Sequence, residues 1–171
     1  MRRLFLLLAL VAIVGTLGAA AIVAAGNGPL SPELQAVRAA TAKYNDVNVA
    51  VADGYVASSP CESSPAGTMG IHYSNRSLTG PGLDPLHPEV LLYLPNGKGS
   101  LKLVGVEYFQ ADADQNKATD ADRPFLFNQG FQGPMDGHNP QMPVHYDLHV
   151  WLYLTNPSGE LNSDNPEVTC R

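Results

Sequence analysis

The strongest constraint on the fold is a strict alternation of apolar and polar residues between positions 144 and 154. One set of alternate residues is apolar: Val144, Tyr146, Leu148, Val150, Leu152 and Leu154. The other set is His145, Asp147, His149, Trp151 and Tyr153. A period of two residues predicts a β-strand with one core face. The second face is unusual, because it carries two imidazoles and a carboxylate where a solvent-facing strand usually carries Lys, Thr or Ser.

Three further segments have the composition of strands. They are residues 69–73 (MGIHY), 89–95 (EVLLYLP) and 100–109 (SLKLVGVEYF). The sequence Asn-Gly-Lys-Gly at 96–99 separates the last two and is typical of a hairpin turn. We expect residues 57–68 to form a loop and residues 110–143 to form a long irregular segment, which inside a compact domain is usually functional.

The N-terminal part of the exported region has the pattern of a helix. Ser31 is a suitable N-cap, Pro32 suits the first turn, and Glu33 lies near the positive end of the helix dipole. Apolar residues then recur at three- and four-residue steps as far as position 51, with a break expected near Asn45 and Asp46. Together these elements predict an α+β fold, in which an amphipathic helix or helix pair packs on an antiparallel sheet.

Residues 1–26 have the layout of an export signal rather than of a folded domain. Arg2 and Arg3 precede an uncharged apolar run from Leu4 to Ala25, which ends in small residues. The run is also long enough to span a bilayer, so an uncleaved membrane anchor remains an alternative to a cleaved signal peptide. Either interpretation predicts that residues 27–171 form one exported domain, secreted or held at the membrane by residues 4–25.

The composition excludes some classes of partner. The chain has 171 residues and a formal net charge of −6, and no Lys or Arg cluster follows Arg3. Nucleic acids and anionic membrane surfaces are therefore not expected as partners. Any contact with the membrane would be made through the N-terminal anchor.

The chain contains two cysteines, Cys61 and Cys170. In an exported protein an isolated, even pair predicts a single disulfide bond. A pair of metal-binding thiolates is the alternative, but neither cysteine lies in a C-x-x-C sequence.

The spacing of methionine and histidine suggests a metal site. Each methionine of the exported region is followed three residues later by a histidine, in the pairs Met69/His72, Met135/His138 and Met142/His145. Thioether and imidazole groups suit copper, and imidazole also suits zinc. The alternative is that Met69 and Met142 only fill space in the core.

Geometry limits which histidines can share one ion. In a straight strand the Cα atoms of His145 and His149 are about 13 Å apart, near the limit for two ligands of one metal. A bulge could bring them together, one of them could bind while Asp147 orients it, or other strands could complete the site. His72 and Glu107 are the expected additional ligands, because a carboxylate within the apolar stretch 103–109 needs a cation or a hydrogen-bond partner. A plain hydrogen bond from Glu107 to a His or Tyr is the alternative.

The sequence therefore predicts a metal site with His72, Glu107, His145 and His149 as ligands. Asp147, Met69 and Met142 are expected just outside the direct ligands, and the ion is expected to be copper or zinc. No catalytic motif, such as G-x-S-x-G, H-E-x-x-H or a phosphate-binding loop, occurs in the sequence. The catalytic residues, if any, cannot be assigned from the sequence.

Several motifs are similar to those of a family of small exported bacterial proteins without an assigned activity. They include KYNDVNVAVADGYV, MGIHYSN, LDPLHPEVLLYLP, LVGVEYF, RPFLF and GPMDGHNPQMPVHYDLHVWLY, and an ending with NP and a cysteine. The resemblance covers nearly all of the exported region. It implies an exported single domain and implies no reaction and no ligand set.

We therefore expect an exported protein that binds a transition metal through a histidine-rich site on its sheet. One alternative is an enzyme that holds a small ligand on a curved sheet, with His145 or His149 as general base and Asp147 or Glu107 orienting it. Another is a cell-surface interaction module that uses Trp151, Tyr153 and the Phe-rich segment 125–131.

Overall fold

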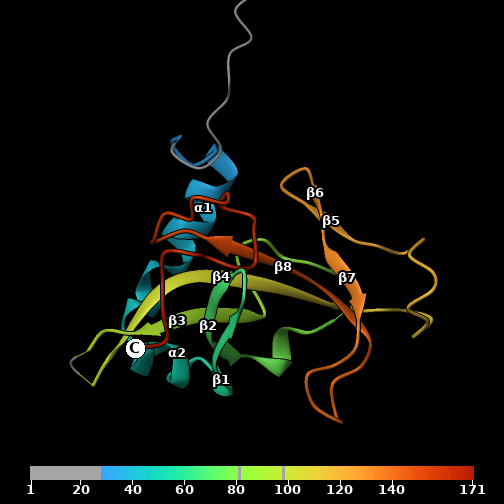
Figure 1. The fold of residues 1–171 in the computed structure, drawn as a ribbon, viewed down its shortest axis with the longest axis horizontal. Coiled ribbons are helices and arrows are strands. Elements are labelled where there is room, and N and C mark those ends of the chain that lie inside the picture. Colours follow the sequence, from blue (N-terminus) through green and yellow to red (C-terminus); the bar gives the residue numbers. More distant parts are fainter. Residues whose placement is uncertain (1–27, 81, 98) are drawn as a thin grey trace, which may run out of the picture.

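The computed structural model describes residues 28–80, 82–97 and 99–171. It has an α+β fold with an antiparallel sheet, as predicted, and the sheet is strongly curved (Figure 1). The predicted signal peptide or anchor lies outside the described residues. Among the residues that the structure describes, no helix is long and apolar enough to cross a membrane.

Three short helical segments follow one another at the start of the described chain. They are α1 (Pro32–Thr41), a 3₁₀ turn η1 (Ala42–Asn45) and α2 (Val47–Ala52). The Ser31 hydroxyl accepts a hydrogen bond from the Leu34 N–H and caps α1. The Asp46 carboxylate caps α2 in the same way, by accepting from the Asn48 N–H. The break between the two helices thus falls where the sequence predicts it.

Six strands form the main sheet in the order β1-β2-β3-β4-β8-β7, and every neighbouring pair is antiparallel. Their bounds are β1 (Val56–Ser64), β2 (Gly67–Ser74), β3 (Val90–Pro95), β4 (Leu101–Ala111), β7 (Gln132–Met135) and β8 (His145–Trp151). A short 3₁₀ turn, η2 (Arg76–Leu78), follows β2. The four predicted strands correspond to β2, β3, β4 and β8.

The prediction of a loop over residues 57–68 is wrong. Most of this segment is β1, and its last two residues begin β2. β1 is an edge strand with a register shift between Ala57 and Cys61, and it is mostly exposed or half-buried. Its Ser- and Pro-rich sequence therefore lacks the apolar alternation of a covered strand, and only the pairing with β2 makes it extended.

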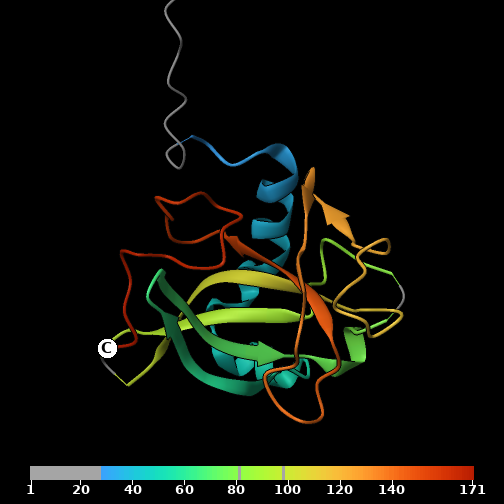
Figure 2. The same cartoon turned by 45° about the vertical axis from the view of Figure 1, so that its right-hand side comes forward.

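The segment 110–143 is irregular for most of its length but is not free of strands. It contains a small two-stranded ribbon, β5 (Phe125–Leu126) with β6 (Gln129–Gly130), and then β7, which pairs with β8. Figures 1 and 2 show this part of the chain as an arm at one end of the curved sheet. The arm returns the chain to the sheet beside β8.

The two faces of the sheet are covered differently. The face toward the helices forms the main core, to which Leu34, Val37 and Tyr44 contribute from the helical segments. Its sheet residues include Leu91, Tyr93, Val106, Tyr108, Tyr146, Leu148 and Val150. The opposite face has a smaller apolar cluster, consisting of Val90, Leu92, Leu94, Val104 and Trp151. We call these the helix face and the site face.

A disulfide bond closes the site face at one end. Cys61 in β1 is bonded to Cys170 near the C-terminus, as predicted, and Cys61 and Val168 both pack against the smaller cluster. The bond joins residues 109 positions apart. The disulfide is compatible with a location outside the cytoplasm.

Candidate metal centre

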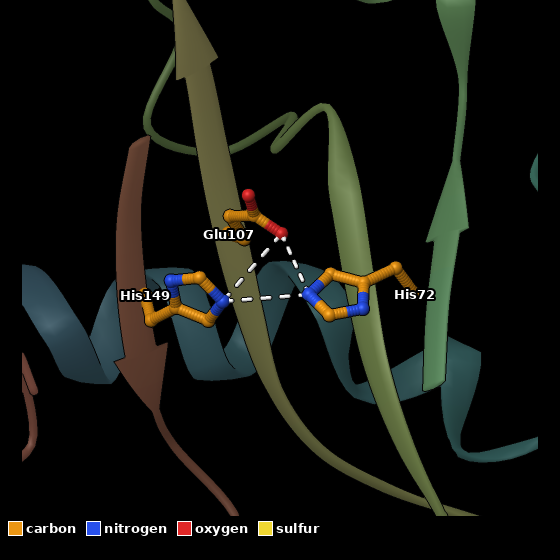
Figure 3. A group of neighbouring side chains, drawn as sticks. All are labelled: His72, Glu107 and His149. Carbon is orange, nitrogen blue, oxygen red and sulfur yellow. Dashed lines mark hydrogen bonds and ion pairs between the residues drawn. The ribbon is translucent and has the colours of Figure 1, made fainter. Parts of the chain in front are cut away.

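Three side chains from three strands meet on the site face. His72 lies in β2, Glu107 in β4 and His149 in β8, and all three are buried (Figure 3). Glu107 and His149 are direct cross-strand partners in the β4–β8 ladder. His72 approaches from the far side of β3, so the group spans four neighbouring strands. Within the residues that the structure describes, this is the one group of three or more such donors close enough to share an ion.

The separations between the donor atoms fit a transition metal. The Glu107 Oε2 atom lies 3.3 Å from His72 Nε2 and 3.8 Å from His149 Nε2. The two Nε2 atoms are 3.4 Å apart. The circle through three atoms at these separations has a radius of about 2.0 Å, close to the length of a zinc bond to nitrogen or oxygen. An ion could therefore contact all three donors without any movement of the strands.

The hydrogen bonds around His72 determine which ring nitrogen faces the group. The Ser59 hydroxyl donates its proton to the carbonyl of Pro60 at 2.8 Å. The same oxygen lies 2.8 Å from His72 Nδ1 and accepts a hydrogen bond from it when the hydroxyl proton is directed to Pro60. In that arrangement His72 Nδ1 carries the hydrogen, and the Nε2 lone pair points at Glu107 and His149. This is the tautomer that a metal ligand needs.

Asp147 supports His149 from the other side. Its Oδ1 atom lies 3.7 Å from His149 Nδ1, which favours a proton on that nitrogen and a lone pair on Nε2. A carboxylate behind a metal-binding imidazole is a common arrangement, since it fixes the orientation and tautomer of the ring. Asp147 thus lies beside His149 and outside the group of His72, Glu107 and His149.

The group holds buried polar atoms that lack hydrogen-bond partners among the described residues. They include Glu107 Oε2, His149 Nδ1 and Asp147 Oδ1. Leaving such atoms unpaired is costly, about 1–3 kcal/mol for each and more where the group is charged. Two lone-pair nitrogens that face a carboxylate oxygen need a shared cation or proton between them. A divalent ion would satisfy the converging lone pairs at once.

Burial and neighbouring charges shift the pKa values of these groups strongly. Burial, and secondarily the neighbouring His149, lower the pKa of His72 to about 3, so this ring is neutral across the physiological range. Burial raises the pKa of the Glu107 carboxyl. Burial opposes protonation of His149, but the carboxylates of Glu107 and Asp147 outweigh it and raise the pKa of that imidazole. Such opposed shifts in one small cluster are typical of functional sites.

The structure does not bring His145 into this group. Its ring is fully buried, stacks on Phe109 at 5.0 Å between centroids, and donates from Nδ1 to the carbonyl of Pro143. Its Nε2 atom lies 4.0 Å from Asp147 Oδ2. The β4–β8 register explains the difference, because His149 stands opposite Glu107 whereas His145 stands opposite Ala111. His145 therefore contacts the group only through Asp147.

The two methionines expected near the metal lie in different surroundings. Met69 lies in β2, three residues before His72, and is not part of either buried apolar cluster. Met142 lies in the loop before β8 and lines the cavity described below. His138, in the same loop, lies edge-on to His145 at 5.5 Å between ring centroids.

A cavity of about 640 Å³ opens over the group. His72 and Glu107 form part of its wall, together with residues of β1, β2, β4 and the loop before β8. Ser59, which holds His72, is also part of this wall. The sequence analysis missed Ser59, because a serine within SSPC has no spacing or periodicity that distinguishes it from any loop residue.

Comparison of the chain with family models, with curated proteins and with solved structures finds no match. The functional interpretation therefore depends on the geometry of the site itself.

Proposed function

We propose that the protein binds a divalent transition metal through His72, Glu107 and His149. The observation that carries the proposal is the convergence of three buried donor atoms, two imidazole nitrogens and one carboxylate oxygen, within 3.3–3.8 Å of one another. Asp147 and Ser59 would orient the two imidazoles. The third predicted ligand histidine, His145, is not needed for this set of donors.

Zinc fits the site best. Two imidazoles and one carboxylate form a donor set that catalytic zinc sites use, with a fourth position left for water or substrate. Copper(II) also accepts imidazole and carboxylate ligands, and the same set suits iron(II). The three donors are nitrogen and oxygen atoms, which suit zinc better than copper(I), an ion that prefers thiolate and thioether ligands.

The two alternative functions receive unequal support. An enzyme with a histidine base would use the same buried group and the same cavity, so it remains compatible with a bound metal. An interaction surface built on Trp151 is less well supported, because the Trp151 indole is buried and donates to the carbonyl of Asn162. Tyr153 is also engaged, through hydrogen bonds with Arg38 and Thr41.

Elemental analysis and thermal unfolding test the proposal. Protein purified from the exported fraction should contain about one equivalent of zinc, copper or iron per chain. After chelation, an excess of Zn²⁺ about 100-fold above its Kd should raise the melting temperature by about 5–10 °C. Affinity should weaken in acid, because a ligand imidazole must be deprotonated to bind.

Variants identify the ligands. His72→Ala with His149→Ala should abolish the thermal shift, while His87→Ala should leave it unchanged. His87 is a matched control because it is an exposed histidine that pairs with Asp84 away from the group. Met135→Leu should likewise have little effect. Absence of any bound metal and of any thermal shift, or an equal shift in the double variant, would refute the proposal.

A further inference from the structure

The cavity over the three donors has the size of a small-molecule site. Its volume of about 640 Å³ lies within the range of about 300–1,000 Å³ that such sites occupy. His72 and Glu107 belong both to the metal group and to the cavity wall, whereas His149 lies beneath the wall. A metal held by the three donors would therefore lie at the floor of the cavity.

The open side of such a metal faces the cavity. Three protein donors leave at least one coordination position for another ligand. The sheet closes the opposite side, and Figure 3 shows a helix lying behind the three strands that carry the donors. His149 and Asp147 occupy the flank toward β8. The free position is thus directed into the space that His72 and Glu107 border.

The wall combines an apolar surface with one exposed cation. Val90, Phe109 and Met142 contribute apolar side chains. Arg76 is the one Lys or Arg in the wall, and its side chain makes no hydrogen bond or ion pair with any residue that the structure describes. A free guanidinium beside a cavity is suited to an anionic group.

Two other acids line the cavity and bear on its charge. Glu62 is one, and Glu89 is the other. Burial raises the pKa of Glu89 to about 7, so this carboxyl is partly neutral near physiological pH. A divalent ion bound by two neutral imidazoles and one carboxylate keeps one positive charge. Arg76 adds a second positive charge, and Glu62 together with the ionised fraction of Glu89 offsets most of the two. An anionic ligand would therefore be attracted locally, by the metal and by Arg76, and not by the net charge of the wall.

We propose that this cavity binds a small organic acid with a short apolar chain. Its carboxylate takes the free position on the metal under the influence of Arg76, and its chain lies against Phe109 and Met142. This inference rests on the proposed metal centre, and it adds the chemical class of the ligand. Neutral molecules of the same shape lack the anionic oxygen that a positively charged metal centre attracts.

Spectroscopy of the Co²⁺-loaded full chain tests the inference. Acetate, hexanoate and hexanamide are titrated separately while the visible d–d spectrum of the metal is recorded. Both carboxylates should change the spectrum, and hexanoate should bind at least tenfold more tightly than acetate, because its chain covers apolar wall. Hexanamide should leave the spectrum unchanged over the same range of concentration.

Two variants separate the contribution of the Arg76 charge from that of the apolar wall that would contact the alkyl chain of the ligand. Arg76→Gln should weaken both carboxylates about three- to tenfold, whereas Met142→Ala should weaken hexanoate and leave acetate unchanged. Phe109→Leu provides a second test of the apolar wall if Met142→Ala alters the loop.

The outcomes distinguish the two proposals. If the chain takes up no Co²⁺, both fall. If Co²⁺ binds but neither carboxylate changes the spectrum, or hexanoate binds no more tightly than acetate, or hexanamide binds equally well, this inference is overturned while the metal centre stands.

Discussion

The two faces of the sheet are built from alternate residues of the same strands, yet they have opposite physical characters. On the helix face, Val106, Leu148 and Val150 contribute to one continuous apolar core. On the site face, their chain neighbours Glu107, Asp147 and His149 form a buried polar group whose atoms are incompletely paired. Burial of the first set stabilises the fold, whereas burial of the second set costs free energy unless something binds between its members.

This difference suggests that the helix face mainly stabilises the fold and that the site face mainly carries the function. The helix face is sealed by the helical segments, while the site face is covered by an edge strand, a C-terminal tail and a loop, with a cavity left between them. The polar group is held in place by strands whose other face is well packed. A rigid framework of this kind keeps the side chains of the polar group in position even when no metal is bound.

The largest effect is expected at the bond that closes the site face. Replacing both cysteines, Cys61→Ser with Cys170→Ser, should lower the free energy of unfolding by about 4–5 kcal/mol, because the bond closes a very long loop in the unfolded chain. Urea unfolding under non-reducing conditions measures the change. A loss below about 1 kcal/mol would contradict the loop-closure explanation for the contribution of this bond.

The next effect concerns the helix face. Leu148→Ala should cost about 3 kcal/mol, since Leu148 is almost fully buried and its removal leaves a cavity in the main core. The affinity for Zn²⁺, measured by calorimetry on the folded variant, should change less than threefold. A large loss of affinity with little loss of stability would contradict the division of roles between the faces.

A smaller effect of opposite sign is expected on the site face. In metal-free protein, Glu107→Gln removes a carboxyl whose pKa burial raises, and the free energy of unfolding should rise by about 1 kcal/mol. The same variant should bind Zn²⁺ at least tenfold more weakly. If Glu107→Gln instead destabilises the metal-free protein by more than 2 kcal/mol, the carboxylate serves the fold and not a metal.

The final expected effect is a change in how stability depends on pH, caused by Glu89, the buried acid at the edge of the cavity. Its pKa is raised by burial from 4.5 to about 7, so the folded state holds this proton more tightly than the unfolded state. The associated stability is therefore fully present below about pH 4.5 and is lost as pH rises through about 7.

Glu89→Gln should remove that part of the pH dependence. Relative to the unchanged protein, the variant should be more stable at pH 8 than at pH 5, as measured by urea unfolding at both values. Parallel stability curves for the two proteins across this range would contradict the expectation. The amide can still accept the hydrogen bond that Phe109 N–H gives to Glu89 Oε2.

The sequence predicts the local features of the site well. Alternation in residues 144–154 places His145, Asp147 and His149 on one face, and the short distances from the Asp147 carboxylate to both imidazoles agree with this. It also predicts that Glu107, within an apolar strand, is buried beside histidine. These predictions depend only on the alternation of residues and on the local composition, and both can be seen within the sequence of a single strand.

Pairing between strands that are distant in the sequence determines which of these residues meet, and the sequence alone does not specify that pairing. The alternation along β8 cannot show which of His145 and His149 joins the group, because residues four positions apart in a strand lie on the same face. The register with β4, set by contacts about forty residues apart in the chain, puts only His149 opposite Glu107. The role of Ser59 likewise depends on how β1 shifts register against β2. Pro60 is compatible with an irregular edge strand but does not specify which side chain is turned toward His72.

The Cys61–Cys170 bond encloses His72, Glu107 and His149 together. A protease that cuts the backbone once, anywhere between the two cysteines, therefore releases nothing. A cut in the exposed stretch 116–121 would leave β2 and β4 on one fragment and β8 on the other, still joined through sulfur. The nicked protein would migrate as one species until it is reduced. The ligand group would then depend on the pairing of strands, and not on an unbroken backbone.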